Sequence, residues 1–188
     1  MLVLFILVTG ILRVLTAGKL LSPIANFTPI GAMALFGGAY FSDTRKSFLF
    51  PLLSLFLSDV VMMQLFYPTL TSGLLYTGWF WTYGAFALMV LIGKTVKTVG
   101  FRPVINVAIA AALTHWLVSD FGVWLGGGTD ITTGLPLTKN WQGFIQCYVQ
   151  AIPYLKNMLL GNLIYCAVLF GGFELLQNRY PVLRIRTA

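Results

Sequence analysis

The feature that most constrains this chain is a series of long apolar stretches that are separated by short loops. Hydrophobic residues make up 58% of the sequence and charged residues 9%, whereas a soluble domain usually carries about 25% charged residues. Too few polar side chains are present to cover a surface that faces water. The sequence therefore predicts an integral membrane protein.

The apolar stretches predict an all-α membrane protein, in which residues 1–188 form a single transmembrane domain. The expected architecture is a bundle of six transmembrane helices, with a short amphipathic helix before the last span. In this amphipathic segment, 142–152, apolar residues recur at helical spacing opposite three glutamines, as in helices that lie on a membrane or over a site. The expected spans are approximately 1–17, 29–41, 47–67, 74–93, 104–125 and 153–176.

The positions of the basic residues predict the orientation of this bundle. Eight of the 12 Lys and Arg residues fall on one side, in the turn after the second span, in the loop after the fourth span and in the C-terminal tail. The loops on the other side carry only Lys19 and Lys139. Because basic loops remain in the cytoplasm, both termini are expected to be cytoplasmic. The expected location is the bacterial inner (cytoplasmic) membrane, as a multi-pass protein.

The stretch from Asn26 to Phe41, NFTPIGAMALFGGAYF, is expected to be the helix around which the others pack. It is too short for a simple span, which needs roughly 20 apolar residues. Its glycines and alanines leave one flank with little side-chain bulk, so neighbouring helices can approach its backbone closely. Two interpretations of its polar start remain open. Asn26 and Thr28 line a ligand site, or they cap a helix that is simply well packed.

Polar and charged side chains gather in the outer half of the predicted bundle. A charge at the middle of a bilayer costs roughly 2.5–3.5 kcal/mol on insertion scales, so these positions require an explanation. One explanation is two structural ion pairs, because Arg13 and Lys156 are positively charged and Asp59 and Asp120 are negatively charged. The other is a pocket open to the outside. The candidate ligand-binding residues are Arg13, Asn26, Asp59, Tyr76, Trp79, Tyr83, His115, Asp120, Lys156 and Asn157.

The position of Lys156 favours the pocket. This residue falls in the first turn of the last span, where the helix dipole disfavours a cation, so an anion is expected nearby. That anion is Asp59, Asp120 or an acidic group on a ligand. The amphipathic segment leads directly into this turn, where it is placed to act as a lid.

Other kinds of chemistry find little support in the sequence. His115 and Asp120 have the H-x4-D spacing of some acyltransferases, but both fall inside an apolar helix, and such short matches arise by chance. No His or Cys pair has the spacing of metal ligands, and no phosphate-binding or ATPase motif occurs. The net charge of +7 comes from helix ends and does not indicate nucleic-acid binding. We expect no enzyme, metal or cofactor. Cys147 is a candidate reactive thiol if it faces the outside.

Several stretches of the chain resemble a family of uncharacterised bacterial six-helix membrane proteins. The most specific is NFTPIGAMALF, and the others are PLLSLFLSDVVM, WTYGAFALMVLIGK, DFGVWL and AIPYLKNMLLGNLIYCAVLFG. That family is similar in size, helix count and outward pocket to the S components of energy-coupling-factor vitamin transporters, including solitary cobalamin transporters. The resemblance implies capture of a vitamin-like molecule from outside, with an energy-coupling transmembrane and ATPase module as a partner.

The chain departs from S components at two points. Its first helix lacks the A-x-x-x-A pattern with which many of them dock on a shared partner, and neither Cys147 nor Cys166 matches the cysteine expected to ligate cobalt in the cobalamin transporters. The predicted function is binding of a small-molecule solute from the outer face, for uptake. The alternative is a non-catalytic structural subunit that contacts other subunits of a larger membrane complex.

Overall fold

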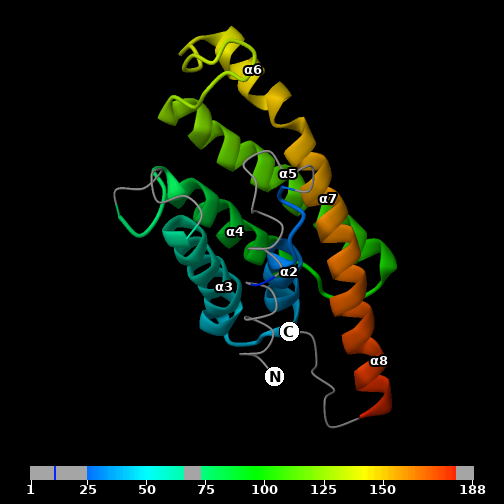
Figure 1. Ribbon diagram of the computed structural model, residues 1–188. Coiled ribbons are helices and arrows are strands. Elements are labelled where there is room, and N and C mark those ends of the chain that lie inside the picture. The colour runs from blue at the N-terminus through cyan, green and yellow to red at the C-terminus, as the bar shows by residue number, and fades with distance from the viewer. Residues whose placement is uncertain (1–10, 12–24, 66–72, 181–188) are drawn as a thin grey trace.

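The computed structural model describes residue 11 and residues 25–65 and 73–180 (Figure 1). This part of the chain is helical and has no β-strand beyond an isolated bridge between Thr129 and Pro136. The first predicted span, 1–17, falls outside the described residues except for residue 11. The helices are α2 (Ile30–Tyr40), α3 (Thr44–Leu65), α4 (Trp79–Lys94), α5 (Phe101–Gly126), α6 (Trp141–Gln150), α7 (Ile152–Cys166), η2 (Ala167–Gly171) and α8 (Gly172–Arg179).

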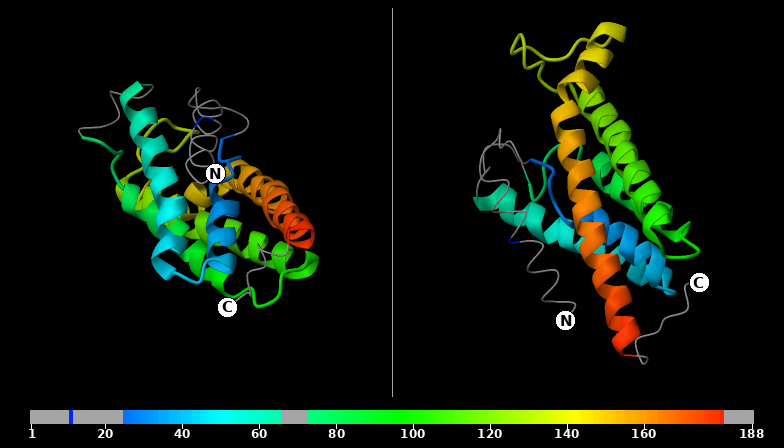
Figure 2. Two further views of the ribbon diagram at one scale, coloured as in Figure 1. Left: turned by 90° about the horizontal axis from the view of Figure 1, so that it is seen from below. Right: turned by 90° about the vertical axis from the view of Figure 1, so that its right-hand side faces the viewer.

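Helix α2 lies at the centre of the described bundle, as its small residues predict. It contacts α3, α4, α5 and α7, and Figure 2 shows it between α3 and the long α7–α8 rod. Every residue of α2 except Phe36 is buried. A helix that is apolar on all sides is expected to be buried on all sides, so the other helices are arranged around this one.

The contact between α2 and α4 brings two backbones together. A Cβ atom added at Gly38 would collide with the carbonyl oxygen of Val90 and with the backbone of Gly93. A Cβ atom added at Gly93 would collide with the backbone of Leu35. Small-residue interfaces in membrane proteins have this geometry, because packing there replaces the hydrophobic driving force that water supplies elsewhere.

Three of the described helices are long and apolar enough to cross a membrane. They are α3, α5 and the continuous rod Ile152–Arg179, which is made of α7, η2 and α8. They correspond to the predicted spans 47–67, 104–125 and 153–176. Large apolar side chains are exposed along all three, among them Leu57, Leu113 and Leu160. Extended apolar surface of this kind is expected to face lipid rather than water, which supports a membrane protein.

Six spanning helices are not observed in the described ranges, so that part of the prediction requires correction. The predicted span 29–41 is an 11-residue helix, roughly 17 Å long at 1.5 Å per residue, whereas the hydrocarbon core is about 30 Å thick. The predicted span 74–93 is reduced to the 16 residues of α4. Its first part, 74–78, is an irregular loop, because Gly78 takes a left-handed φ of 81° directly before Trp79.

The predicted amphipathic segment forms α6, at one end of the bundle between α5 and α7 (Figure 1). The helix starts after Asn140, whose side-chain oxygen accepts a hydrogen bond from the Gly143 backbone N–H at 2.9 Å. An asparagine at this position satisfies one of the backbone donors that the first turn leaves unpaired. The bounds of α6, Trp141–Gln150, are close to the predicted 142–152.

We expect Gly38→Ala and Gly93→Ala to destabilise the protein, because each added methyl group forces the α2 and α4 backbones apart. Overpacking of this kind costs about 1–3 kcal/mol. The measurement is thermal unfolding of the purified protein in detergent. The control is Gly84→Ala in α4, where an added Cβ meets no neighbouring atom within 4 Å and which gains the same helix propensity. A Gly93→Ala protein as stable as Gly84→Ala would contradict the backbone contact.

Candidate functional site

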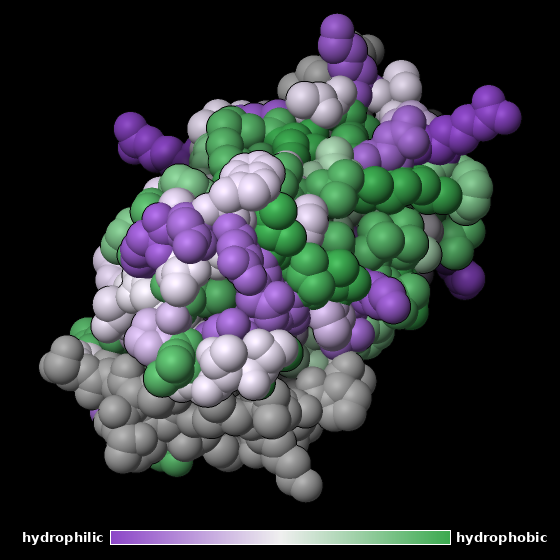
Figure 3. Space-filling model, turned by 90° about the horizontal axis from the view of Figure 1, so that it is seen from above, coloured by the Kyte–Doolittle hydropathy of each residue, from purple (hydrophilic) through white to green (hydrophobic). Residues whose placement is uncertain are grey.

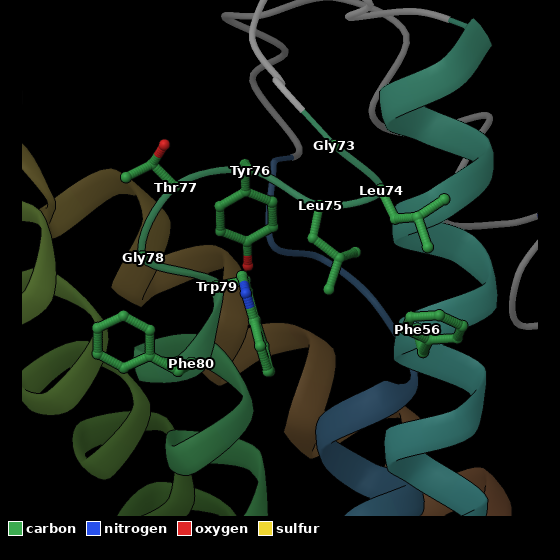
Figure 4. Close-up of a pocket in the computed structure, with 9 residues that line it drawn as sticks. All are labelled: Phe56, Gly73, Leu74, Leu75, Tyr76, Thr77, Gly78, Trp79 and Phe80. Atoms are coloured by element: carbon green, nitrogen blue, oxygen red, sulfur yellow. The ribbon is translucent and has the colours of Figure 1, made fainter.

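An open pocket of about 450 Å³ lies at the start of α4. Its walls are the loop 73–78, the first two residues of α4 and Phe56 of α3. Figure 4 shows Tyr76 and Trp79 next to each other in the middle of this pocket, with Phe56 on the far wall. We call it the aromatic pocket. It brings together two of the predicted ligand-binding residues, and its volume suits a small organic solute.

The aromatic pocket is connected to Asp59 through Tyr83. Trp79 packs edge-on against Tyr83, with ring centroids 5.1 Å apart, and the Tyr83 hydroxyl donates a hydrogen bond to Asp59 Oδ2 at 3.1 Å. Asp59 is 1% exposed, and a carboxylate at that depth needs hydrogen-bond donors to offset the loss of water. Tyr76, Trp79, Tyr83 and Asp59 therefore lie in one region, built from α3, α4 and the loop between them.

A second group of predicted residues lies around α5. His115 is 7% exposed, and its ring packs against Phe86 of α4 with centroids 5.1 Å apart. Together with Asn26, Asp120 and Tyr154 it lines a narrow cavity of about 10 Å³. A cavity of that size holds about one water molecule. This second group therefore forms a polar junction between α5, α7 and the start of α2 rather than a solute pocket of its own.

Two further predicted residues, Lys156 and Asn157, line neither cavity. The Asn157 side chain donates a hydrogen bond to the Ala25 backbone carbonyl at 2.9 Å, which anchors the segment that enters α2. Lys156 lies on an exposed face of α7 and, among the described residues, forms no ion pair with Asp59 or Asp120. Thus neither of the two carboxylates that were expected as alternatives to an acidic ligand group pairs with Lys156. Arg13 lies outside the described residues.

Sequence reasoning missed three parts of the site. Phe56 resembles any other apolar residue of a span, so nothing marked it as a pocket wall. Residues 74–78 of the loop were expected to be helical, and the loop forms the opposite wall. Tyr154, in the narrow cavity, carried a usable signal, because aromatic residues near the end of a span mark the membrane interface.

Helix α6 and the loop before it cover the C-terminal end of α5, and Asp130 holds this loop in place. The Asp130 carboxylate accepts hydrogen bonds from the Thr132 backbone N–H at 2.8 Å and the Thr132 hydroxyl at 2.7 Å. It also accepts one from the Gln146 side chain of α6 at 3.3 Å. The bonds from Thr132 lower the pKa of Asp130 below its ordinary value. From above, this end of the molecule shows hydrophilic side chains among hydrophobic ones (Figure 3).

Cys147 of α6 is not the exposed thiol that the sequence left open. It is 1% exposed, and its thiol donates a hydrogen bond to the Asp120 backbone carbonyl at 3.4 Å. Burial, followed by the nearby Asp120 carboxylate, raises the pKa of the Cys147 thiol to about 11. A thiol with such a pKa stays protonated at neutral pH and is a poor nucleophile. The thiol thus connects α6 to α5 through this hydrogen bond.

We expect the loop 129–137 to loosen as the pH falls below about 4, the ordinary pKa range of an Asp side chain. The folded-state pKa of Asp130 is lowered, so its hydrogen bonds stabilise the loop above that range and are lost as the pH falls through the folded-state pKa. Hydrogen exchange of the loop, corrected for the intrinsic pH dependence of exchange, measures this. In Asp130→Asn the pH dependence should disappear, and a response equal to that of the wild type would contradict the assignment.

We expect the hydrogen bond between Tyr83 and Asp59 to be energetically coupled in a double-mutant cycle. Tyr83→Phe should lower the free energy of unfolding by roughly 1.5–3 kcal/mol, because it removes a donor from a buried carboxylate. The same substitution should cost less in the Asp59→Asn background. Denaturant unfolding in detergent measures both values. Tyr180→Phe, at an exposed position after α8, is the control. Because the amide oxygen in Asp59→Asn can still accept this bond, equal losses in the two backgrounds would contradict a strengthening of the bond by the Asp59 charge.

The chain is similar in sequence to a known protein family. A family model matches residues 1–183, and its description is a family of unknown function, DUF6580. No curated protein and no solved structure matches the chain significantly. The matched residues include α2, the aromatic pocket and the polar junction around α5. The chain therefore belongs to the DUF6580 family of unknown function.

Proposed function

We propose that this protein is a multi-pass protein of the bacterial inner membrane that binds a small, vitamin-like solute from the outer face, as S components do, for uptake. The observation that carries the proposal is the aromatic pocket, where Trp79 contacts Tyr83 and Tyr83 is hydrogen-bonded to the buried Asp59. Buried ionisable groups within membrane proteins are commonly functional. A buried carboxylate directly behind a solute-sized pocket fits that expectation.

The lining of the pocket favours a flat and largely apolar solute. Phe56, Trp79 and Phe80 supply aromatic surface, and Tyr76 adds a ring with a polar end. Aromatic rings of a ligand stack on such surfaces, and the peptide groups of the loop 73–78 offer hydrogen-bonding partners for its polar edge. The shape and chemistry of a heterocyclic vitamin match this combination.

The proposed orientation places the aromatic pocket on the outer side and both termini in the cytoplasm. Basic residues support this orientation. Lys94 ends α4, Arg102 is in the first turn of α5 and Arg179 ends α8. All three lie at the end of the bundle opposite α6, and basic helix ends face the cytoplasm.

Because the sequence has no ATPase motif, uptake requires energy from another protein, and an energy-coupling transmembrane and ATPase module is the proposed partner.

Ligand binding is expected to depend on Trp79. Native mass spectrometry of the protein purified in mild detergent should find a co-purified small molecule, and Trp79→Ala should weaken its binding about tenfold or more, because the ring buries apolar ligand surface. Trp141→Ala is the matched control, since Trp141 is exposed on α6 and is not in the pocket. Equal ligand affinity in Trp79→Ala and Trp141→Ala would overturn the assignment of the pocket.

The alternative, a structural subunit of a membrane complex, predicts a different pattern. Asp59→Asn in a binding protein should lower ligand occupancy while the protein stays folded and monodisperse. In a structural subunit, the wild type should carry no small molecule, and Asp59→Asn should release partner subunits during purification from the native membrane. Loss of partners without any bound ligand in the wild type would replace the proposed function with this alternative.

A further inference from the structure

A second hollow lies between α5 and the α7–α8 rod. It is on the side of the bundle away from the loop 73–78 of the aromatic pocket. Its volume is about 510 Å³. Phe101, Val104 and Ile105 of α5 form one wall, and Leu163, Ala167 and Gly171 of the rod form the other. We call it the α5–α7 groove. Both walls belong to helices that are long and apolar enough to cross a membrane, so the groove opens toward lipid.

The rod departs from regular α-helix where it lines this groove. Residues Ala167–Gly171 form the π-helical turn η2, and Ala167, Phe170 and Gly171 all line the hollow. Phe170 is buried in the core, whereas Ala167 and Gly171 are exposed and small. Single π-turns within α-helices are rare and are frequent at functional sites. Here the turn places its two smallest residues on the groove wall, which leaves room for a ligand.

Positive charge lies at the end of the groove where α5 begins. Arg102 follows the groove-lining Phe101 directly and is exposed, and Arg179 is exposed at the end of α8. Glu174 is the acidic residue of the lining, and its carboxylate accepts a hydrogen bond from the Tyr40 hydroxyl. An anion at this end of the groove would therefore have the exposed Arg102, which directly follows the lining residue Phe101, as its basic partner, while the Glu174 carboxylate of the lining is bonded to Tyr40 of α2.

We infer that the α5–α7 groove binds one acyl chain of an anionic phospholipid, with the lipid phosphate beside Arg102. The apolar walls match a hydrocarbon chain, and the basic end matches a phosphate. Basic pockets between transmembrane helices on the cytoplasmic side bind anionic headgroups in this way. The lipid reaches the groove from the leaflet without crossing the protein. This inference does not depend on the proposed solute or on uptake.

Two adjacent glycines provide a matched test of the acyl-chain site. An added Cβ meets no neighbouring atom within 4 Å at Gly171 or at Gly172, but only Gly171 lines the groove. The probe is phosphatidylglycerol added to the full chain in mild detergent, with phosphatidylcholine as the neutral competitor, and bound lipid is counted by native mass spectrometry. Wild type and Gly172→Leu should retain phosphatidylglycerol, and Gly171→Leu should lose most of it.

The headgroup is tested separately. Arg102→Gln should lower the preference for phosphatidylglycerol over phosphatidylcholine about fivefold, as expected for one basic residue near an anionic lipid surface. Arg45→Gln, at an exposed position in the first turn of α3, should leave the preference unchanged. An equal effect of the two substitutions would overturn the placement of the phosphate beside Arg102.

Three results would overturn the inference as a whole. The first is equal retention of phosphatidylglycerol by Gly171→Leu and Gly172→Leu. The second is a dimer that dissociates in Gly171→Leu, which would show that a second copy of the chain fills the groove. The third is equal binding of both lipids by the wild type. If Gly171→Leu fails to fold, Ala167→Leu fills the same groove from the preceding turn and is judged by the same outcomes.

Discussion

The shortness of helix α2 is the constraint on which the rest of this structure depends. An 11-residue helix is too short to span the hydrocarbon core of a bilayer, and lipid cannot hydrogen-bond the backbone groups at its ends. Other helices must therefore cover those ends. At one end, Asn157 of α7 donates a hydrogen bond at 2.9 Å to the Ala25 carbonyl in the segment that leads into α2; at the other, the Ser47 hydroxyl of α3 donates one at 3.2 Å to the Phe41 carbonyl directly after α2.

The shortness of α2 also explains why polar residues gather at its start. The longer helices α3 and α5 carry Asp59 and His115, and Asn26 lies just before α2. Asn26 shares the narrow cavity with His115 and Asp120, so the space at the start of the short helix is occupied by polar side chains from its neighbours. A bundle of equally long apolar helices would have no such region, and polar side chains within it would lack partners.

The sequence was sufficient to predict the elements that depend on local pattern. The glycines and alanines of 26–41 predicted a buried central helix, and the period of apolar residues around Gln146 predicted α6. The length of α4 could not be predicted from hydropathy, because the left-handed conformation of Gly78 has no hydropathy signal. The hydrogen bond between Tyr83 and Asp59 joins residues on different helices, and only packing decides which tyrosine reaches which carboxylate.

Helix α2 is in contact with the elements that line both hollows. It packs against α4, whose first residues form part of the aromatic pocket, and against η2, which lines the α5–α7 groove. Close-packed interiors have low compressibility and transmit small displacements. Gly38 and Gly93 leave no space between α2 and α4 that could absorb such a displacement. A displacement of η2 that shifts α2 is therefore expected to shift α4 as well. Helix α2, although too short to span a bilayer, is the part of the fold that joins the elements lining the aromatic pocket and the α5–α7 groove.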